Sequence, residues 1–269
     1  MKGLSVIITV IVAIIFVCGL FACQKKGVTK TVVLLCDLSE STKHVRNFYL
    51  DSFKTVLSSI SHGDVLVMAK ITEASITEPS IPIKKEFPPF VAKDKMGNPT
   101  DNPVIVRRLK EEADKNLEET KSELLKIATT LVRGSEPPIG DRPEVKEPSK
   151  RILRTDIFSS LHVAAGLFKE YKRDKSILVV LSDMIEESSD YDFKKEHLTE
   201  RRIEAIIRKE KAADRLPDLR GVKVYVVCAG VTTKDMFFAL QRFWLRYFKE
   251  CGADLKKERY ASALAAFNE

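Results

Sequence analysis

The sequence lacks the motifs by which the common enzyme classes are found. It contains no Gly-x-Ser-x-Gly elbow, no phosphate-binding loop, no His-Glu-x-x-His and no Cys-x-x-Cys pair. Its four histidines, His44, His62, His162 and His197, lack the spacing that metal-binding histidines show. We therefore predict that the chain is not an enzyme.

Clustered positive charge is also missing. The 45 basic and 38 acidic residues are interspersed, and the net charge of +7 is modest for 269 residues. This pattern is typical of a solvated surface and not of a nucleic-acid-binding face, so we predict no nucleic-acid partner. Because 44% of the residues are hydrophobic, the chain has enough apolar material for a sizeable core.

Cysteines are too few for a disulfide framework. Two of the five, Cys18 and Cys23, belong to the N-terminal segment, which leaves Cys36, Cys228 and Cys251. An odd remainder cannot pair completely. Cys36 and Cys228 lie in apolar runs, where cysteine commonly packs as a small hydrophobe. We predict buried free thiols, with a Cys228–Cys251 bridge as the alternative.

The N-terminus carries the longest uncharged stretch of the chain. After Lys2, the residues from Leu4 to Ala22 are mostly Val, Ile, Leu and Phe. Such a segment is an export signal or a membrane anchor, and its length is close to the roughly 20 residues that span a bilayer. We predict that residues 1–22 are a signal peptide or membrane anchor and that residues 23–30 are a tether.

The end of this segment helps to separate the two possibilities. The residues from Leu20 to Cys23 read Leu-Phe-Ala-Cys, which resembles the lipobox of bacterial lipoproteins. That resemblance implies cleavage before Cys23, lipidation of its thiol, and a lipoprotein of the cell envelope that faces the periplasm or the outside. The alternative is an uncleaved, single-pass membrane helix; in both cases the chain is tethered to a membrane.

Downstream, strand-like and helix-like segments alternate. Four apolar, β-branched runs predict buried strands at residues 31–36, 64–71, 176–182 and 222–228. Amphipathic patterns predict helices at about 43–61, 156–171, 194–213 and 234–249, with a terminal helix at 259–267. This order predicts an α/β fold: a doubly wound, mostly parallel central sheet with helices on both faces, extending over residues 31–269.

One region interrupts the alternation. At about residues 73–150, prolines flank a long helical pattern that includes Ile105, Leu117 and Leu131. We predict an insertion with irregular ends around one charged helix. That helix is expected to pack across the sheet, and a coiled-coil partner surface is the alternative.

Oxygen-bearing side chains gather at three predicted loops. Asp37, Ser39 and Ser41 follow the first strand, Thr155 precedes a helix, and Asp183 follows the strand at 176–182. Ligands bind beyond the carboxyl ends of parallel strands, so these residues can converge there. Hard oxygen donors with little charge favour Mg²⁺ or Mn²⁺ with waters retained. Each residue could instead cap a helix or end a strand.

This order of motifs resembles the von Willebrand factor A (VWA) domain over about residues 31–267. The resemblance implies a metal-ion-dependent adhesion site (MIDAS) for magnesium, made by the five residues just named, with Asp183 often acting through water. It also implies a binding module whose partner is a protein that presents Asp or Glu to the cation. Arg154 and Met184 stand where the family usually has Gly, so the loops can differ in shape, and the insertion can shape the ligand face.

Two other functions remain open. Asp37 at a strand end, with Asp183 nearby, could belong to a Mg²⁺-dependent phosphohydrolase in which the first carboxylate is the nucleophile. Haloacid dehalogenase-like enzymes carry a second Asp two positions on, where this chain has Ser39. The other possibility is a structural envelope protein with a vestigial site.

Overall fold

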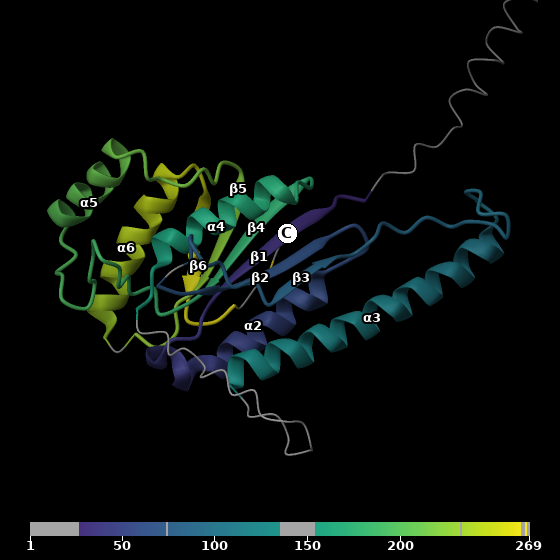
Figure 1. The fold of residues 1–269 in the computed structure, drawn as a ribbon, viewed down its shortest axis with the longest axis horizontal. Helices are drawn as coiled ribbons and strands as arrows, with labels where there is room; N and C mark the ends of the chain where they lie inside the picture. The colour runs from purple at the N-terminus through teal and green to yellow at the C-terminus, as the bar shows by residue number, and fades with distance from the viewer. Residues whose placement is uncertain (1–26, 74, 135–153, 232, 265–266, 268–269) are drawn as a thin grey trace, which may run out of the picture.

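A six-stranded sheet forms the centre of the molecule (Figure 1). The computed structural model describes residues 27–73, 75–134, 154–231, 233–264 and 267. The strands are β1 (Lys30–Asp37), β2 (Val65–Ile71), β3 (Ile83–Glu86), β4 (Lys175–Leu181), β5 (Val222–Val227) and β6 (Asp254–Ala261). Their order is β3-β2-β1-β4-β5-β6, and every neighbouring pair is parallel except β2 and β3. The predicted mostly parallel α/β sheet is confirmed.

Helices cover both faces of the sheet (Figure 1). They are the 3-10 helix η1 (Glu40–Val45) and the α-helices α2 (Arg46–Ser59), α3 (Pro103–Arg133), α4 (Ile157–Glu170), α5 (Glu200–Ala212) and α6 (Lys234–Glu250). Alternate residues of β1 face opposite sides: Val32 and Leu34 pack with α2 and α3, whereas Val33 and Leu35 pack with α4, α5 and α6. Because both faces are covered, all eight residues of β1 are buried.

Helix α3 is much longer than the sheet is deep. Its 31 residues span about 46 Å at 1.5 Å per residue, whereas the eight residues of β1 span about 26 Å. Its buried residues, Lys121, Leu124, Ala128 and Val132, lie in the second half. That half packs on α2, and the first half continues past the amino edge of the sheet, where the parallel strands begin (Figure 1).

Three local predictions were wrong. Residues 254–261 form strand β6, so the C-terminal helix predicted from residue 259 is not present there. Residues 83–86, within the segment predicted to be irregular, form the antiparallel edge strand β3. The helix predicted from residue 194 begins at Glu200, because Thr199 caps it by accepting a hydrogen bond from the Arg202 N–H.

The cysteines follow the first of the two predictions. Cys36, Cys228 and Cys251 are all buried and free, so no Cys228–Cys251 bridge forms. The Cys228 thiol lies 3.3 Å from the backbone oxygen of Asp183, to which it donates. Cys228 therefore fills space in the core next to the loop that carries Asp183.

The predicted anchor, the lipidation residue Cys23 and part of the insertion lie outside the described residues. Among the helices that the structure does describe, none has both the length and the apolar character needed to cross a bilayer.

Candidate metal site

Two carboxylates meet at the carboxyl edge of the sheet because β1 and β4 are neighbours. Asp37 is the last residue of β1. The parallel register pairs Cys36 with Leu181, the last residue of β4, so Ser182 and Asp183 follow directly beside Asp37. The Ser182 hydroxyl donates to Asp37 Oδ2 at 3.0 Å. The sheet register therefore places the two predicted acidic residues at one end.

A chain of hydrogen bonds joins four of the five predicted residues. The Ser39 N–H donates to Asp37 Oδ1 at 2.9 Å. The hydroxyl oxygens of Ser39 and Ser41 are 3.0 Å apart, and the Ser41 hydroxyl donates to Asp183 Oδ2 at 3.0 Å. The loops after β1 and β4 are thus linked through the oxygen atoms that a cation would use.

Thr155 reaches the same edge through its backbone. The residue is buried, and its carbonyl accepts a hydrogen bond from the Glu187 N–H at 2.8 Å. Within the described part of the chain, no hydrogen bond joins its hydroxyl to the other four residues. That Thr155 is a ligand stays a prediction.

Helix capping does not account for these side chains. Ser39 precedes η1, but its side chain makes no capping hydrogen bond within the described residues. Helix α4 is capped by Asp156, whose Oδ1 accepts from the Ser159 N–H at 2.8 Å, and not by Thr155. Helix capping therefore does not explain Ser39 or Thr155, whereas Asp183 Oδ1 accepts from the Ile185 N–H at 3.0 Å, as a turn residue does.

The carboxylates are in an environment that disfavours their negative charge. Asp37 is fully buried, and this burial raises the pKa of its carboxyl. Burial, followed by the nearby charge of Asp37, raises the pKa of Asp183 to about 6. The set of two carboxylates and three hydroxyls offers hard oxygen donors with room for waters, which fits Mg²⁺ or Mn²⁺. The described residues hold no cluster of three or more His, Cys, Asp or Glu able to hold a metal ion, so a cation here would depend on the hydroxyls and on water as well.

Sequence reasoning missed several residues around this cluster. Ser182 fixes Asp37 Oδ2. Glu187 forms an ion pair with Lys194. The charge of Glu187 also contributes to the raised pKa of Asp37, and the charge of Asp183 contributes to the raised pKa of Lys194. A hydroxyl residue directly after a buried strand was a visible signal for Ser182. The Glu187–Lys194 pair depends on how the loop folds back and had no such signal.

Glu186 is a further missed residue, and it orients the loop that carries Thr155. Its Oε2 accepts hydrogen bonds from the N–H groups of Ile157 and Phe158, at 2.8 and 3.3 Å, which are the first residues of α4. Burial, with a smaller contribution from Asp156, raises its pKa from 4.5 to about 8. The side chain ties the start of α4 to the loop after β4.

The raised pKa of Glu186 predicts a pH-dependent stability. Between pH 4.5 and about 8 the unfolded chain has lost this proton while the folded protein still holds it. Stability therefore falls as pH rises through this window, at roughly 1 kcal/mol per pH unit. Glu186→Gln removes this titrating group. In urea unfolding at pH 5, 6.5 and 8, the free energy of unfolding of the variant should therefore rise relative to that of the wild type as the pH increases. A constant difference across these pH values would contradict the assignment.

The residue after Asp183 has an unusual backbone. Met184 has a φ of 63°, in the left-handed region that glycine adopts most easily. Its N–H donates to the Ser182 hydroxyl at 3.0 Å, and its carbonyl accepts from Trp244 Nε1 at 2.9 Å. The turn expected of a glycine is thus kept by a methionine, with the loop held from both sides.

Comparisons with known proteins identify structural neighbours and no sequence relatives. No protein-family model matches the sequence, and no curated protein matches it either. The pilus adhesin SpaC of Lactobacillus rhamnosus GG, in its open conformation, is 10% identical with a TM-score of 0.45; the match covers 88% of this chain and 28% of the adhesin.

Two further neighbours are a manganese-loaded protein and a von Willebrand factor type A protein. Manganese-loaded TRAP of Plasmodium vivax is 11% identical with a TM-score of 0.35, covering 78% of this chain and 62% of TRAP. The von Willebrand factor type A protein of Catenulispora acidiphila is 11% identical with a TM-score of 0.34, and the match covers 84% of this chain and 43% of that protein. The chain thus spans less than two thirds of each of these three proteins.

Proposed function

We propose that this protein is a membrane-tethered, VWA-like binding module that captures an acidic residue of a partner protein through a Mg²⁺ or Mn²⁺ ion. The observation that carries the proposal is the continuous hydrogen-bonded set of Asp37, Ser39, Ser41 and Asp183 at the carboxyl edge. The second candidate, a phosphohydrolase with Asp37 as nucleophile, is less well supported, because Ser39 stands where haloacid dehalogenase-like enzymes carry their second Asp.

Each residue has a defined part in this proposal. Asp37 supplies the buried negative charge, Ser39 and Ser41 supply neutral oxygens, and Asp183 and Thr155 complete the set from the neighbouring loops. Because most of these donors are uncharged, the bound cation keeps an open position with electrophilic character, which a carboxylate can fill.

The surface beside the cluster can receive a partner. A hollow of about 450 Å³ is lined by two basic residues, Arg154 and Lys195, and by four acidic ones, Glu187, Asp190, Asp192 and Glu196. Arg154, which the family resemblance did not predict next to Thr155, adds positive charge there. A partner with an acidic residue in an extended segment would find both the cation and a guanidinium at this end of the sheet.

Panning a random peptide display library against the full-length protein in detergent tests this function. We expect peptides retained in Mg²⁺ and eluted by chelator to share an Asp or Glu, and replacement of that residue by Asn or Gln to abolish their binding. Ser41→Ala should retain none of them, and because Ser41 is exposed this change leaves the core intact.

Two results would contradict the proposal. One is enrichment of peptides that bind equally well with chelator present, and the other is hydrolysis of a generic phosphomonoester that requires both Mg²⁺ and Asp37. The second result would establish the phosphohydrolase in its place.

A further inference from the structure

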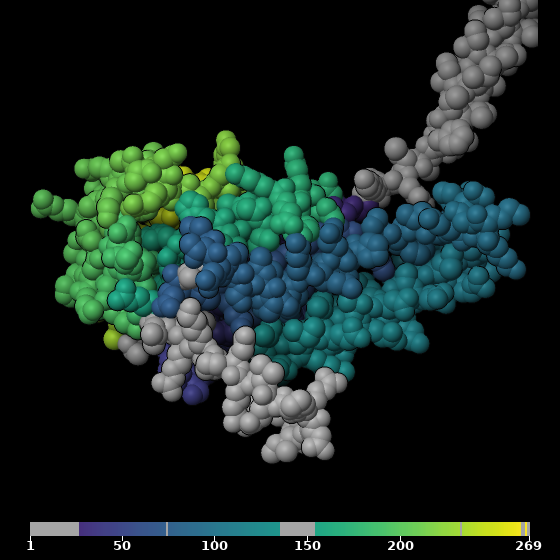
Figure 2. Space-filling view, viewed as in Figure 1, coloured from purple at the N-terminus to yellow at the C-terminus, as the bar shows by residue number. Residues whose placement is uncertain are grey.

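A lobe projects from the amino edge of the sheet, opposite the candidate metal site. We define the lobe as residues 88–110, which comprise the chain that follows β3 and the first two turns of α3. The Phe87 carbonyl accepts from the Gly63 N–H at 2.9 Å, where β2 is about to begin, which fixes the base of the lobe at the amino edge. Figures 1 and 2 show it extending beyond the main body. The other end of α3 lies near Arg46, whose guanidinium binds the Leu38 carbonyl beside the metal site.

Exposed apolar side chains gather on this lobe and next to it. The described residues include eight strongly exposed large hydrophobic side chains, and four of them are at this end: Val28, Val91, Met96 and Val104, at 65%, 55%, 88% and 70% exposure. Met96 lies at the tip of a tight turn in which Asp94 accepts from the N–H groups of Met96 and Asn98. The turn is therefore fixed by its own hydrogen bonds while it presents a methionine to solvent.

Basic residues are interspersed with these apolar side chains along the sequence, and one of them, Arg107, pairs with Glu111 at 3.9 Å. Residues 91–110 contain five basic side chains and two acidic ones, and all five basic side chains are exposed: Lys93, Lys95, Arg107, Arg108 and Lys110. One of the two acids, Asp94, is occupied by the turn just described. Apolar side chains interspersed with Lys and Arg are typical of proteins that insert into the headgroup layer of an anionic bilayer.

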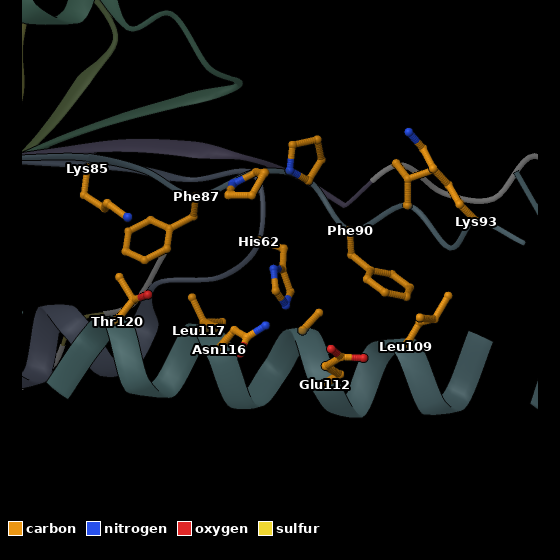
Figure 3. Close-up of a pocket in the computed structure, with 14 residues that line it drawn as sticks. His62, Lys85, Phe87, Phe90, Lys93, Leu109, Glu112, Asn116, Leu117 and Thr120 are labelled. Carbon is orange, nitrogen blue, oxygen red and sulfur yellow. The ribbon is translucent and has the colours of Figure 1, made fainter. Parts of the chain in front are cut away.

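The apolar surface continues into a groove behind the tip. The groove has a volume of about 510 Å³ and lies between the chain at 85–93 and the first half of α3 (Figure 3). Phe87, Phe90, Leu109 and Leu117 line it, and Val91 belongs to both the groove and the exposed tip. Val91 thus joins the exposed side chains of the lobe to a partly apolar groove.

The start of the described chain lies at the same edge. Thr29 is close to Gly63 and Pro89, since a Cβ placed on Gly63 would lie 2.8 Å from Thr29 Cγ2 and 4.0 Å from Pro89 Cβ. Val28 and Thr29 are separated from the apolar stretch that ends at Ala22 by only five residues, 23–27. Five residues reach at most about 18 Å when fully extended. Any bilayer that holds that stretch is therefore within reach of the lobe.

We propose that the lobe docks on the surface of an anionic phospholipid bilayer, with Val91, Met96 and Val104 in the headgroup layer and the interspersed Lys and Arg on lipid phosphates. This proposal shares with the proposed function only the N-terminal anchor. Docking at the amino edge would direct the carboxyl edge, with Asp37 and Asp183, away from the membrane and toward a partner.

Site-specific fluorescence quenching in vesicles tests the docking. The full-length protein carries one environment-sensitive dye at Met96→Cys, or at Ile76→Cys as the matched control. Ile76 is also an exposed hydrophobic residue, at 55%, but it follows β2 at the carboxyl edge. Cys36, Cys228 and Cys251 are buried and do not compete for the dye, and the protein without an added cysteine, treated in the same way, gives the signal from Cys18 and Cys23 that is subtracted. Vesicle-bound protein is isolated by flotation, and quenching by lipids with a quencher near the headgroup is recorded.

In phosphatidylglycerol-containing vesicles we expect strong quenching at position 96 and little at position 76. Neutral vesicles, high salt, or the added changes Lys93→Glu, Lys95→Glu and Arg108→Glu should lower the quenching at position 96 toward the control. Asp37→Asn should leave it unchanged, which separates this proposal from the metal site.

Equal quenching at positions 96 and 76, or quenching at 96 that survives charge reversal, would overturn the proposal. So would a stable dimer in detergent that is lost with Met96→Asp, because the exposed surface would then be covered by a second copy of the chain.

Discussion

Replacing Asp37 by Asn is expected to abolish the thermal stabilisation that Mg²⁺ gives to the wild-type protein. At a Mg²⁺ concentration about a hundredfold above Kd, binding stabilises the folded state by about 2.7 kcal/mol. For a chain of this size that corresponds to a rise in Tm of roughly 5–10 °C, at about 2–4 °C per kcal/mol. Asn keeps the size of the side chain and removes the charge that a divalent cation requires, so the rise should vanish.

The stability of Asp37→Asn in the absence of metal is a second test of the site. The wild-type carboxylate is buried beside Asp183, and both carboxyl groups have raised pKa values because burial disfavours their charge. Asp37→Asn in chelator should therefore be at least as stable as the wild type. Thermal unfolding with Mg²⁺ and with chelator, followed by circular dichroism, measures both effects.

Asp156→Asn is the matched control for this experiment. Asp156 lies next to Thr155 and caps α4, and Asn is an equally good capping residue. Its Mg²⁺ response should equal that of the wild type. A wild-type protein that does not respond to Mg²⁺ or Mn²⁺, or an Asp37→Asn variant that responds fully, would contradict the metal site.

The central sheet was predictable because its strands are buried on both faces. The continuous apolar runs of β1, β2, β4 and β5 allow few other structures. Strand β6 gives no such signal, since it is an exposed edge strand with the sequence Asp-Leu-Lys-Lys-Glu-Arg-Tyr-Ala. Those residues favour a helix by intrinsic propensity, and only pairing with β5 makes them extended. A charged edge also protects the sheet from pairing with other chains.

The positions of the candidate site's residues could be predicted where they depend on a strand end, and not where they depend on a loop. Asp37 ends β1 and Asp183 comes two residues after β4, so the sheet alone brings them together. Glu186 lies in the loop after β4, and its bonds to the start of α4 require that this loop fold back. A glutamate five residues past the end of β4 has nothing in its local sequence to indicate this contact.

Trp244 is expected to couple the aromatic core to the metal site. It is fully buried on α6, with ring centroids 5.4 Å from Phe158 and 5.0 Å from Phe243. Its Nε1 is the donor to the Met184 carbonyl, next to Asp183. Trp244→Ala should lower the free energy of unfolding by about 3–5 kcal/mol, because it opens a cavity in this cluster.

Trp244→Phe separates packing from the hydrogen bond. Phenylalanine keeps an aromatic ring but leaves the buried Met184 carbonyl without its donor, at a cost of about 1–3 kcal/mol. Because the left-handed turn at Met184 loses one of its two supports, Asp183 should be held less firmly, and the affinity for Mg²⁺ should fall. Urea unfolding in chelator measures the first effect, and calorimetric titration with Mg²⁺ measures the second.

Phe243→Leu provides the comparison that decides between the two explanations. Phe243 packs against the same aromatic rings, at 6.1 Å from Phe158 and 4.8 Å from Phe193, and among the described residues its side chain makes no hydrogen bond to the loop of Asp183. It should lose stability with an unchanged Mg²⁺ affinity. If both variants weaken Mg²⁺ binding equally, the loss reflects a softened core, and the Trp244–Met184 bond has no particular part in holding the site.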